Sequence, residues 1–428
     1  MNKRHTAFCD QLALLFANSS WHYSVLAALS IESVEHLPPD INLVIDKMLD
    51  RFDDRPSAEE LVAYLRKSPL IKNWFIGRAP WPRISRYVLI PDAKPSFADP
   101  HLPTIDSLPV LAEWLQLERG ELEWMADLWR TQTQEESHLN HYIYRTTQKS
   151  RGGVRVLEIP KTRIKAIQRQ ILREIVDLMP LHDAAKGFRK HLSCKDHAGL
   201  HVGKKFVFLF DIAHCFQSIS WVRVKRLFQQ LGYPNSVAAY LAGLCCHRTR
   251  WQQLPTADLG SELRNRLLRR HLPQGAPTSP GLANAAMYHF DLRVSGLAKK
   301  FGYVYSRYAD DIAISSDKRW PQGYLEPLIG AIALEEGFAL NFRKTRLKRQ
   351  HQKQKIVGVV CNERLNVDRK EYDKLKAILT NCLRHGIDSQ NRNQHTNFRA
   401  HLAGKIAHEK SLNSSRGEKL ESLFARIR

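Results

Sequence analysis

The strongest constraint on how this chain folds is a short apolar segment that ends at a single acidic residue. Phe206–Phe210 reads FVFLF and is followed at once by Asp211. A continuous apolar run of this length predicts a strand that is buried on both faces. Asp211 is the only acidic residue between Asp196 and Asp258, and burying an ionised carboxylate is costly unless something compensates its charge. A bound metal ion would do so; capping of the following helix is the alternative interpretation.

A second acidic feature lies in the segment YVYSRYADDIAIS. Its two halves, Tyr303–Tyr308 and Ile312–Ser316, predict a hairpin whose tight turn contains Asp310 and Asp311. Adjacent carboxylates repel each other, although Asp is also common in turns for local reasons. Together with Asp211, the pair would supply converging carboxylates for two Mg²⁺ ions. One ion would activate an attacking hydroxyl and the other would stabilise a departing pyrophosphate.

The pattern of helices and strands changes near Tyr142. Helices are predicted before it over Gln11–Ala17, Ile41–Phe52, Ala58–Leu65, Pro109–Leu117 and Glu121–Arg130, with one short strand at Tyr87–Ile90. Ser107 suits a helix N-cap, and Gly120 suits a break between the last two of these helices. The segments predicted after it are the strands Val154–Ile159 and Phe206–Phe210, the hairpin, the helices Arg163–Leu178, Trp221–Leu231 and Ser236–Cys246, and basic helices beyond Asn366. This alternation is typical of an α/β or α+β domain.

The charge of the chain is distributed unevenly. Residues 1–150 contain 16 Lys or Arg and 20 Asp or Glu, whereas residues 151–428 contain 49 and 23, a net charge of +26. A positive field confined to one part of a chain is expected for a surface that binds nucleic acid. The alternative is a solvated face without a partner, which is the usual explanation of a single basic run.

Composition narrows the protein class further. With 43% hydrophobic and 25% charged residues, the chain has an ordinary globular composition, and no uninterrupted apolar stretch is long enough to span a membrane. The seven cysteines are scattered without a CxxC pair, which favours reduced thiols and a cytoplasmic protein rather than a disulfide framework or a zinc site.

Several sequence blocks, in this order, resemble the reverse transcriptases of the bacterial retron and group II intron branch. The blocks are GGVRVLEIPKTRIKAIQRQIL, AAKGFRKHLS, FDIAHCFQSI, LPQGAPTSPGLANAAM, YADD, EEGFALNFRKTRL and HLAGKIAHEKSLNSSRGEKLESLF. The resemblance runs from about Ser107 to the C-terminus. It implies an α+β right-hand polymerase with fingers, palm and thumb and a mainly helical N-terminal extension. The implied domains are 1–100, an extension of unknown role; 101–145, a helical lead-in; 146–365, fingers and palm; and 366–428, a helical thumb.

The resemblance also implies roles for single residues. Asp211, Asp310 and Asp311 correspond to the catalytic, metal-binding carboxylates, and the backbone carbonyl of Ile212 to a further ligand of two Mg²⁺ ions. Phe216, five residues after Asp211, falls at the steric-gate position, where a bulky ring excludes a ribose 2′-hydroxyl and so favours dNTPs.

Further dNTP contacts are implied on other blocks. Gln274 and Gly275 would line the nascent base pair, where Gly permits close backbone approach. Lys149 and Arg155 would meet the triphosphate, supplying charge where it develops, and Lys344 is a candidate proton donor to the pyrophosphate. For Lys149 and Lys344 the alternative is an ordinary surface lysine.

Two blocks depart from the retron pattern. Where retron enzymes usually carry Asn-Ala-x-x-His, this chain has His197-Ala198-Gly199-Leu200-His201, and where they carry Val-Thr-Gly it has Ile356-Val357-Gly358. His201 keeps its place and is expected to contact RNA, with a packed or surface histidine as the alternative.

Domains that the sequence lacks restrict the choice of subfamily. The 62 residues after Asn366 are too few and too poor in carboxylates for an RNase H domain, and no His/Cys-rich endonuclease is expected. A retron enzyme remains, for which the family implies a structured noncoding RNA as template and primer, a branched RNA–DNA product, anti-phage defence and a possible accessory effector protein. The alternatives are a non-retron defence-associated reverse transcriptase and, in a different class, an RNA-binding scaffold or antitoxin component that acts by sequestration.

Overall fold

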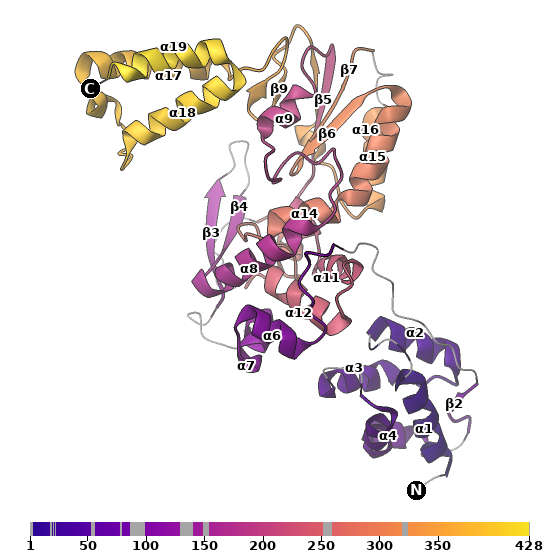
Figure 1. Ribbon diagram of the computed structural model, residues 1–428. Coiled ribbons are helices and arrows are strands. Elements are labelled where there is room, and N and C mark those ends of the chain that lie inside the picture. Colours follow the sequence, from indigo (N-terminus) through magenta and orange to yellow (C-terminus); the bar gives the residue numbers. More distant parts are fainter. Residues whose placement is uncertain are drawn as a thin grey trace. The chain divides into compact units, whose positions relative to one another are not determined.

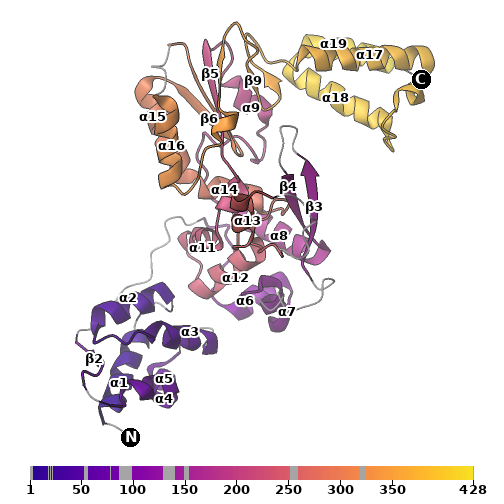
Figure 2. The ribbon, with the colours of Figure 1, turned by 180° about the vertical axis from the view of Figure 1, so that it is seen from behind.

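The computed structural model contains two compact units. It describes residues 3–17, 19, 21, 23–52, 56–77, 79–85, 99–128, 140–148, 154–250, 259–318 and 324–427. The first unit combines Met1–Met179 with Ser220–Thr278, and the second combines Pro180–Ile219 with Ser279–Arg428. Both units mix helices with strands (Figures 1 and 2). The chain crosses between the units three times, so residues close in sequence do not always share a unit.

The N-terminal part of the first unit is a small helical assembly with its own core. Its elements are α1 (Lys3–Ala17), α2 (Tyr23–Ser33), β1 (Val34–Glu35), α3 (Ile41–Arg51), α4 (Ala58–Lys67), α5 (Pro69–Trp74) and β2 (Arg83–Ile84). The helices pack through fully buried side chains such as Leu12, Phe16 and Ile45. The three helices predicted before residue 70 are confirmed, whereas the strand predicted at Tyr87–Ile90 lies outside the described residues.

The remainder of the first unit surrounds a β-hairpin with helices. Its elements are α6 (Leu108–Leu115), α7 (Arg119–Ala126), β3 (Tyr142–Gln148), β4 (Val154–Pro160), α8 (Thr162–Glu174), a 3₁₀ turn (Val176–Leu178), α11 (Trp221–Gln230), α12 (Asn235–Cys245) and α13 (Ser261–Leu267). Ser107 is the N-cap of α6, as predicted. The predicted break at Gly120 is wrong, because Gln116 ends α6 in the left-handed conformation and Glu118 caps α7 before Gly120.

The second unit contains a four-stranded antiparallel sheet in the order β6-β7-β5-β8. The strands of this sheet are β5 (Phe206–Asp211), β6 (Val304–Tyr308), β7 (Asp311–Ser316) and β8 (Arg346–Arg349). The other elements around it are α9 (Cys194–Gly199), α10 (Cys215–Ser218), α14 (Ser279–Ala286), α15 (Tyr288–Phe301), α16 (Leu325–Glu335), a 3₁₀ turn (Phe342–Lys344), β9 (Lys355–Ile356) and β10 (Val359–Val360). The predicted strand and hairpin are both present. Burial of β5 is only partial, because Val207 and Phe210 are buried whereas Phe206, Phe208 and Leu209 keep some exposure.

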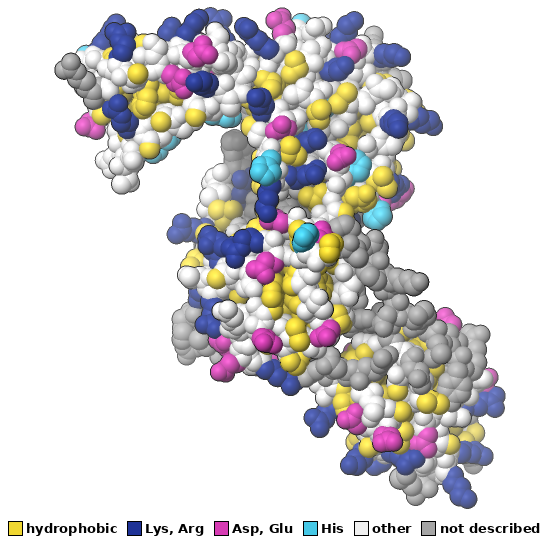
Figure 3. Space-filling model, in the orientation of Figure 1, with side chains coloured by type: hydrophobic (Ala, Val, Ile, Leu, Met, Phe, Trp, Pro, Cys, Tyr) yellow, Lys and Arg dark blue, Asp and Glu magenta, His cyan; other side chains and the backbone are white. Residues whose placement is uncertain are grey.

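The C-terminal helices of the second unit form a separate core. They are α17 (Arg369–His385), a 3₁₀ turn (Ile387–Gln390), α18 (Phe398–Leu412) and α19 (Ser414–Ala425). Leu379, Leu402 and Leu420 are among the side chains that meet in this core. In the part of the chain that is described, no helix has the length and apolar character needed to cross a membrane. Lys and Arg side chains are spread over the visible face of both units (Figure 3).

Candidate active site

Asp211 and Asp311 lie opposite each other on neighbouring strands of the second unit. In the antiparallel pair of β5 and β7, the register places the Cα atom of Asp211 beside that of Asp311. The next residue after β5, Ile212, donates its backbone N–H to the carbonyl oxygen of Asp310 at 3.0 Å. The structure therefore places the three predicted aspartates at one end of the sheet.

The turn that carries Asp310 is unusually tight. Tyr308 pairs with Asp311, so only Ala309 and Asp310 connect β6 to β7. Two-residue hairpin turns of this kind need residues with positive φ, for which Gly and Asn are preferred. Ala309 takes a φ of +56°, a left-handed conformation that is strained for a residue with a Cβ atom. Surrounding contacts have to hold it there.

The electrostatics of this end of the sheet favour a cation. Asp311 keeps an exposed face at the strand end, yet loss of solvation on its inner side and the negative charges of Asp310 and Asp211 raise its pKa to about 7. The Lys344 ammonium acts in the opposite direction. Like charges so close to one another favour the binding of a positive ion between them.

The donor chemistry of the three aspartates fits a divalent metal ion that prefers oxygen ligands. Among the residues described, no three His, Cys, Asp or Glu side chains converge closely enough to hold a metal ion unaided. Mg²⁺ commonly takes only one or two carboxylates and fills its other positions with substrate phosphates and water. Asp211, Asp310, Asp311 and the Ile212 carbonyl therefore suit a metal ion that is shared with a phosphate-bearing ligand.

Lys344 is placed at the carboxylates by a short backbone connection. The Asn341 N–H donates to the Asp211 carbonyl at 2.7 Å, which fixes the start of the 3₁₀ turn that ends at Lys344. From there the Lys344 Nζ donates to Asp211 Oδ1 at 2.7 Å. The Lys344 side chain is 41% exposed, so its ammonium can reach a ligand as well as the carboxylate.

Phe216 lies in the short helix α10, one turn beyond Asp211. His214 precedes this helix in a left-handed conformation, with a φ of +50°, which redirects the chain after β5. The Phe216 ring is half-buried. It therefore keeps part of its surface available for contact with a ligand.

Arg155, Gln274 and Gly275 belong to the first unit. Arg155 is exposed on β4, and Lys149 lies outside the described residues. Gln274 is anchored through its carbonyl oxygen, which accepts from the Glu158 N–H of β4 at 2.9 Å. Gly275 has a φ of +137°, and a Cβ atom there would lie 2.8 Å from the Glu158 carbonyl oxygen. Both features require Gly at this position.

Replacing Gly275 with Ala should lower the free energy of unfolding by about 2 kcal/mol, because the new Cβ meets the β4 backbone and the backbone conformation becomes strained. Urea denaturation measures the change. Gly296→Ala is the matched control: this glycine lies inside α15 with open space around it, so Ala should raise stability by up to about 1 kcal/mol. Equal losses in both variants would show that close approach does not matter at Gly275.

The expectation that His201 contacts RNA is corrected by its position. His201 is fully buried, and its ring nitrogens form hydrogen bonds to Ser315 Oγ at 2.7 Å and Ser306 Oγ at 2.8 Å. Burial, and after it the charges of His197 and Lys204, lower its pKa to about 3. A neutral ring packed beneath the sheet fits the alternative of a core histidine, because no surface of it is open to a nucleic acid.

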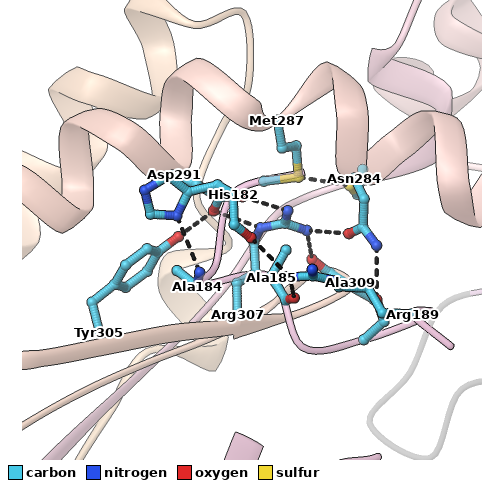
Figure 4. A network of polar contacts seen from close by, with 12 residues as sticks. His182, Ala184, Ala185, Arg189, Asn284, Met287, Asp291, Tyr305, Arg307 and Ala309 are labelled. Carbon is cyan, nitrogen blue, oxygen red and sulfur yellow. Dashed lines mark hydrogen bonds and ion pairs between the residues drawn. The ribbon is translucent and has the colours of Figure 1, made fainter. Parts of the chain in front are cut away.

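A buried arginine that lies close to Asp291 and Ala309 was not predicted from the sequence (Figure 4). Arg307 of β6 has no exposed surface and forms an ion pair with the equally buried Asp291 of α15 at 2.6 Å. Burial alone would lower the pKa of the guanidinium, but the Asp291 carboxylate raises it above the ordinary value. A charged residue within an apolar hairpin strand is the signal that could have identified it.

A second buried network supports the first unit. Glu158 of β4 is fully buried and accepts hydrogen bonds from His271 Nε2 at 2.9 Å and Thr249 Oγ1 at 2.7 Å. Burial opposes ionisation of Glu158, but His271 lowers its pKa below the ordinary value. The inward-facing positions of β4 include Val154, Val156 and Glu158. An acidic residue at such a position in an alternating strand is the sequence signal that could have identified this network.

One protein family and several known proteins are similar to this chain. Residues 147–361 match the model of the family described as reverse transcriptase (RNA-dependent DNA polymerase). The chain is 38% identical over 282 residues to the retron Mx65 reverse transcriptase of Myxococcus xanthus, covering 66% of this chain and 64% of that protein. It is 34% identical over 276 residues to the retron Mx162 reverse transcriptase of the same organism, covering 61% and 54%.

A third relative comes from another bacterium. The retron Ec86 reverse transcriptase of Escherichia coli is 29% identical over 225 residues, covering 52% of this chain and 64% of that protein. The alignments thus span between 54% and 64% of these three relatives' own lengths. The family match covers β5, the β6–β7 hairpin and the three aspartates, and it confirms the α+β right-hand polymerase fold. The three relatives confirm the retron-type resemblance. This chain belongs to the reverse transcriptase family.

Proposed function

We propose that this chain is an RNA-directed DNA polymerase that extends DNA from dNTPs on an RNA template. The observation that carries the proposal is the meeting of Asp211, Asp310 and Asp311 at one end of a sheet within the segment that matches the reverse transcriptase family. We assign residues 1–100 to an extension, 101–145 to a helical lead-in, 146–365 to fingers and palm, and 366–428 to the thumb.

In this proposal two Mg²⁺ ions are held by Asp211, Asp310, Asp311 and the Ile212 carbonyl oxygen. When bound, such ions activate the attacking hydroxyl and stabilise the charge of the leaving pyrophosphate. The aspartates concentrate negative charge, as the raised pKa of Asp311 indicates. Lys344, whose ammonium lies 2.7 Å from Asp211, would supply a proton to the leaving group.

The remaining candidate residues would select and position the nucleotide. Lys149 and Arg155 would neutralise the triphosphate, and Gln274 and Gly275 would support the new base pair. Gly275 suits this role because its backbone is held close to β4 with no side chain of its own. Phe216 would contact the sugar.

If Phe216 is the steric gate, Phe216→Ala should raise the incorporation of ribonucleotides relative to deoxyribonucleotides by about 100-fold, because removal of the ring leaves space for a 2′-hydroxyl. Single-nucleotide incorporation with matched dNTP and rNTP pairs measures this ratio. Phe208→Ala offers a control, since Phe208 is a partly exposed ring on β5 that is not assigned to the sugar. An unchanged ratio in Phe216→Ala would assign the gate elsewhere.

The names of the three relatives support a retron-type substrate. In this proposal a structured noncoding RNA serves as both template and primer, and the product is a branched RNA–DNA molecule made in the cytoplasm for anti-phage defence. The basic residues beyond position 150 would bind the RNA backbone. The N-terminal helical assembly, with its separate core, could dock an accessory effector protein.

Primer extension tests the proposed chemistry directly. The purified full-length chain, given an RNA template, a primer, dNTPs and Mg²⁺, should lengthen the primer and should stop when EDTA is added. RNA binding with no extension under any divalent metal would instead favour a scaffold that acts by sequestration.

A further inference from the structure

Arg307 connects the interior of the second unit to the turn that carries Asp310. Its Nε and Nη2 atoms donate to the two carboxylate oxygens of Asp291 at 2.8 and 2.6 Å. Its Nη1 atom donates to Asn284 Oδ1 at 3.0 Å and to the carbonyl oxygen of Ala309 at 2.9 Å. One buried guanidinium therefore joins α15, α14 and the turn (Figure 4).

The contact to Ala309 falls at the strained residue of the turn. Ala309 has a φ of +56° and directly precedes Asp310, so its peptide orientation determines where the Asp310 carboxylate starts. Strained backbone persists only where surrounding contacts hold it. The Arg307 hydrogen bond to the Ala309 carbonyl is such a contact, and its charge and burial make it stronger than a neutral bond at the surface.

The segment Ala184–Gly187 supports the turn from another side. Arg307 donates its N–H to the Ala184 carbonyl at 2.8 Å and accepts from the Lys186 N–H at 2.7 Å. Asn284 Nδ2 donates to the Gly187 carbonyl at 2.7 Å. A Cβ atom on Gly187 would lie 2.8 Å from the Ala309 backbone nitrogen and 3.1 Å from the Tyr308 ring. The turn thus fits closely against this segment, with no room for a larger residue.

We infer that Arg307 is a positioning residue: by holding the Ala309 carbonyl against Asp291 and Asn284, it fixes the Asp310 turn in the geometry that binds the divalent metal. The inference rests on the proposed function, since it concerns the same carboxylates. It predicts that disturbing this contact weakens metal binding in protein that is still folded. A purely structural role would lower stability and leave metal affinity unchanged.

The test is Mn²⁺ binding by the full-length chain in the presence of an RNA template, a chain-terminated primer and the matching dNTP, followed through the EPR signal of the free ion and compared with the same mixture without protein. Arg307→Lys retains a positive charge for Asp291, but a single ammonium cannot reproduce the planar fork that reaches Asp291, Asn284 and Ala309 together. We expect this variant to bind Mn²⁺ about tenfold more weakly than the original chain, a difference of about 1.4 kcal/mol. The Mg²⁺ concentration for half-maximal extension should rise by a similar factor.

Tyr305→Phe is the matched control. The Tyr305 hydroxyl donates to Asp291 Oδ1 at 2.5 Å, so its loss disturbs the same buried cluster without removing the bond to Ala309. The Mn²⁺ affinity of this variant should stay within about twofold of that of the original chain, because Arg307 still holds the Ala309 carbonyl. Equal weakening in Tyr305→Phe and Arg307→Lys would overturn the inference.

Gly187→Ala disturbs the turn without changing any charge. It should weaken Mn²⁺ binding as Arg307→Lys does, because the new Cβ displaces the Ala309 nitrogen, and it decides the question if Arg307→Lys does not fold. If whichever of Arg307→Lys and Gly187→Ala folds binds Mn²⁺ as tightly as the original chain, the positioning role of Arg307 is wrong, while the proposed function still stands. Failure of the original chain to show Mn²⁺ binding that Asp310→Asn weakens would contradict the proposed function, and the inference with it.

Discussion

Asp310→Asn should reduce dNTP incorporation by at least about a thousandfold, equivalent to about 4 kcal/mol of lost transition-state stabilisation. The amide keeps the size and the turn geometry of the carboxylate but removes one of three negative charges that would hold the metal ions. Primer extension under single-turnover conditions, with protein concentration matched across variants, gives the ratio.

Stability should not fall in the same variant. The charges of Asp310 and Asp211 already raise the pKa of Asp311, so removing one like charge relieves repulsion and could add up to about 1 kcal/mol to the free energy of unfolding. Asp317→Asn is the control, because Asp317 follows the opposite end of β7 and forms an exposed ion pair with Lys204. It should extend primers at the original rate. Substantial extension by folded Asp310→Asn would contradict the metal assignment.

Asp291→Ala should lower the free energy of unfolding by about 3–5 kcal/mol, the range observed when one partner of a buried ion pair is removed. Arg307 is fully buried and forms two hydrogen bonds to Asp291, so the variant leaves a positive charge with no counterion in the interior. The Tyr305 hydroxyl loses its acceptor as well. Urea denaturation monitored by circular dichroism measures the loss.

Two further variants distinguish the cost of leaving Arg307 unpaired from the cost of breaking any ion pair. Asp10→Ala breaks the half-exposed pair between Asp10 and Arg66 and should cost about 1 kcal/mol or less. The double variant Asp291→Leu with Arg307→Met should lose less than Asp291→Ala, since it leaves no unpaired buried charge. A loss below about 1 kcal/mol for Asp291→Ala would mean that water or another group compensates Arg307.

Sequence periodicity predicted the elements that carry the site. The apolar run before Asp211 and the two halves around Asp310 and Asp311 correspond to β5, β6 and β7. These strands could be predicted from the sequence because strand patterning and turn residues are local signals. The pairing of Asp211 with Asp311 joins residues 100 positions apart. No local pattern gives this pairing, and the similarity of the ordered blocks to a known family supported it beforehand.

The parts that escaped prediction depend on contacts between distant segments. Arg307 and Asp291, like Glu158 and His271, are charged residues whose partners no local pattern reveals. His201 was expected to contact RNA, but the two serines that enclose it lie more than 100 residues further along the chain. The misplaced helix break at Gly120 has a local cause: Gln116 took the left-handed conformation that Gly usually provides.

The most direct test of the account is the nucleic acid that co-purifies with the full-length chain when it is expressed with its own flanking sequence. On a denaturing gel, we expect a discrete DNA that RNase does not degrade but whose mobility shifts after RNase treatment, and we expect it to be missing from the Asp310→Asn protein. A shift of this kind identifies DNA covalently joined to RNA. DNA of equal yield from Asp310→Asn would contradict the polymerase assignment, whereas RNA alone from the original chain would contradict the retron-type product.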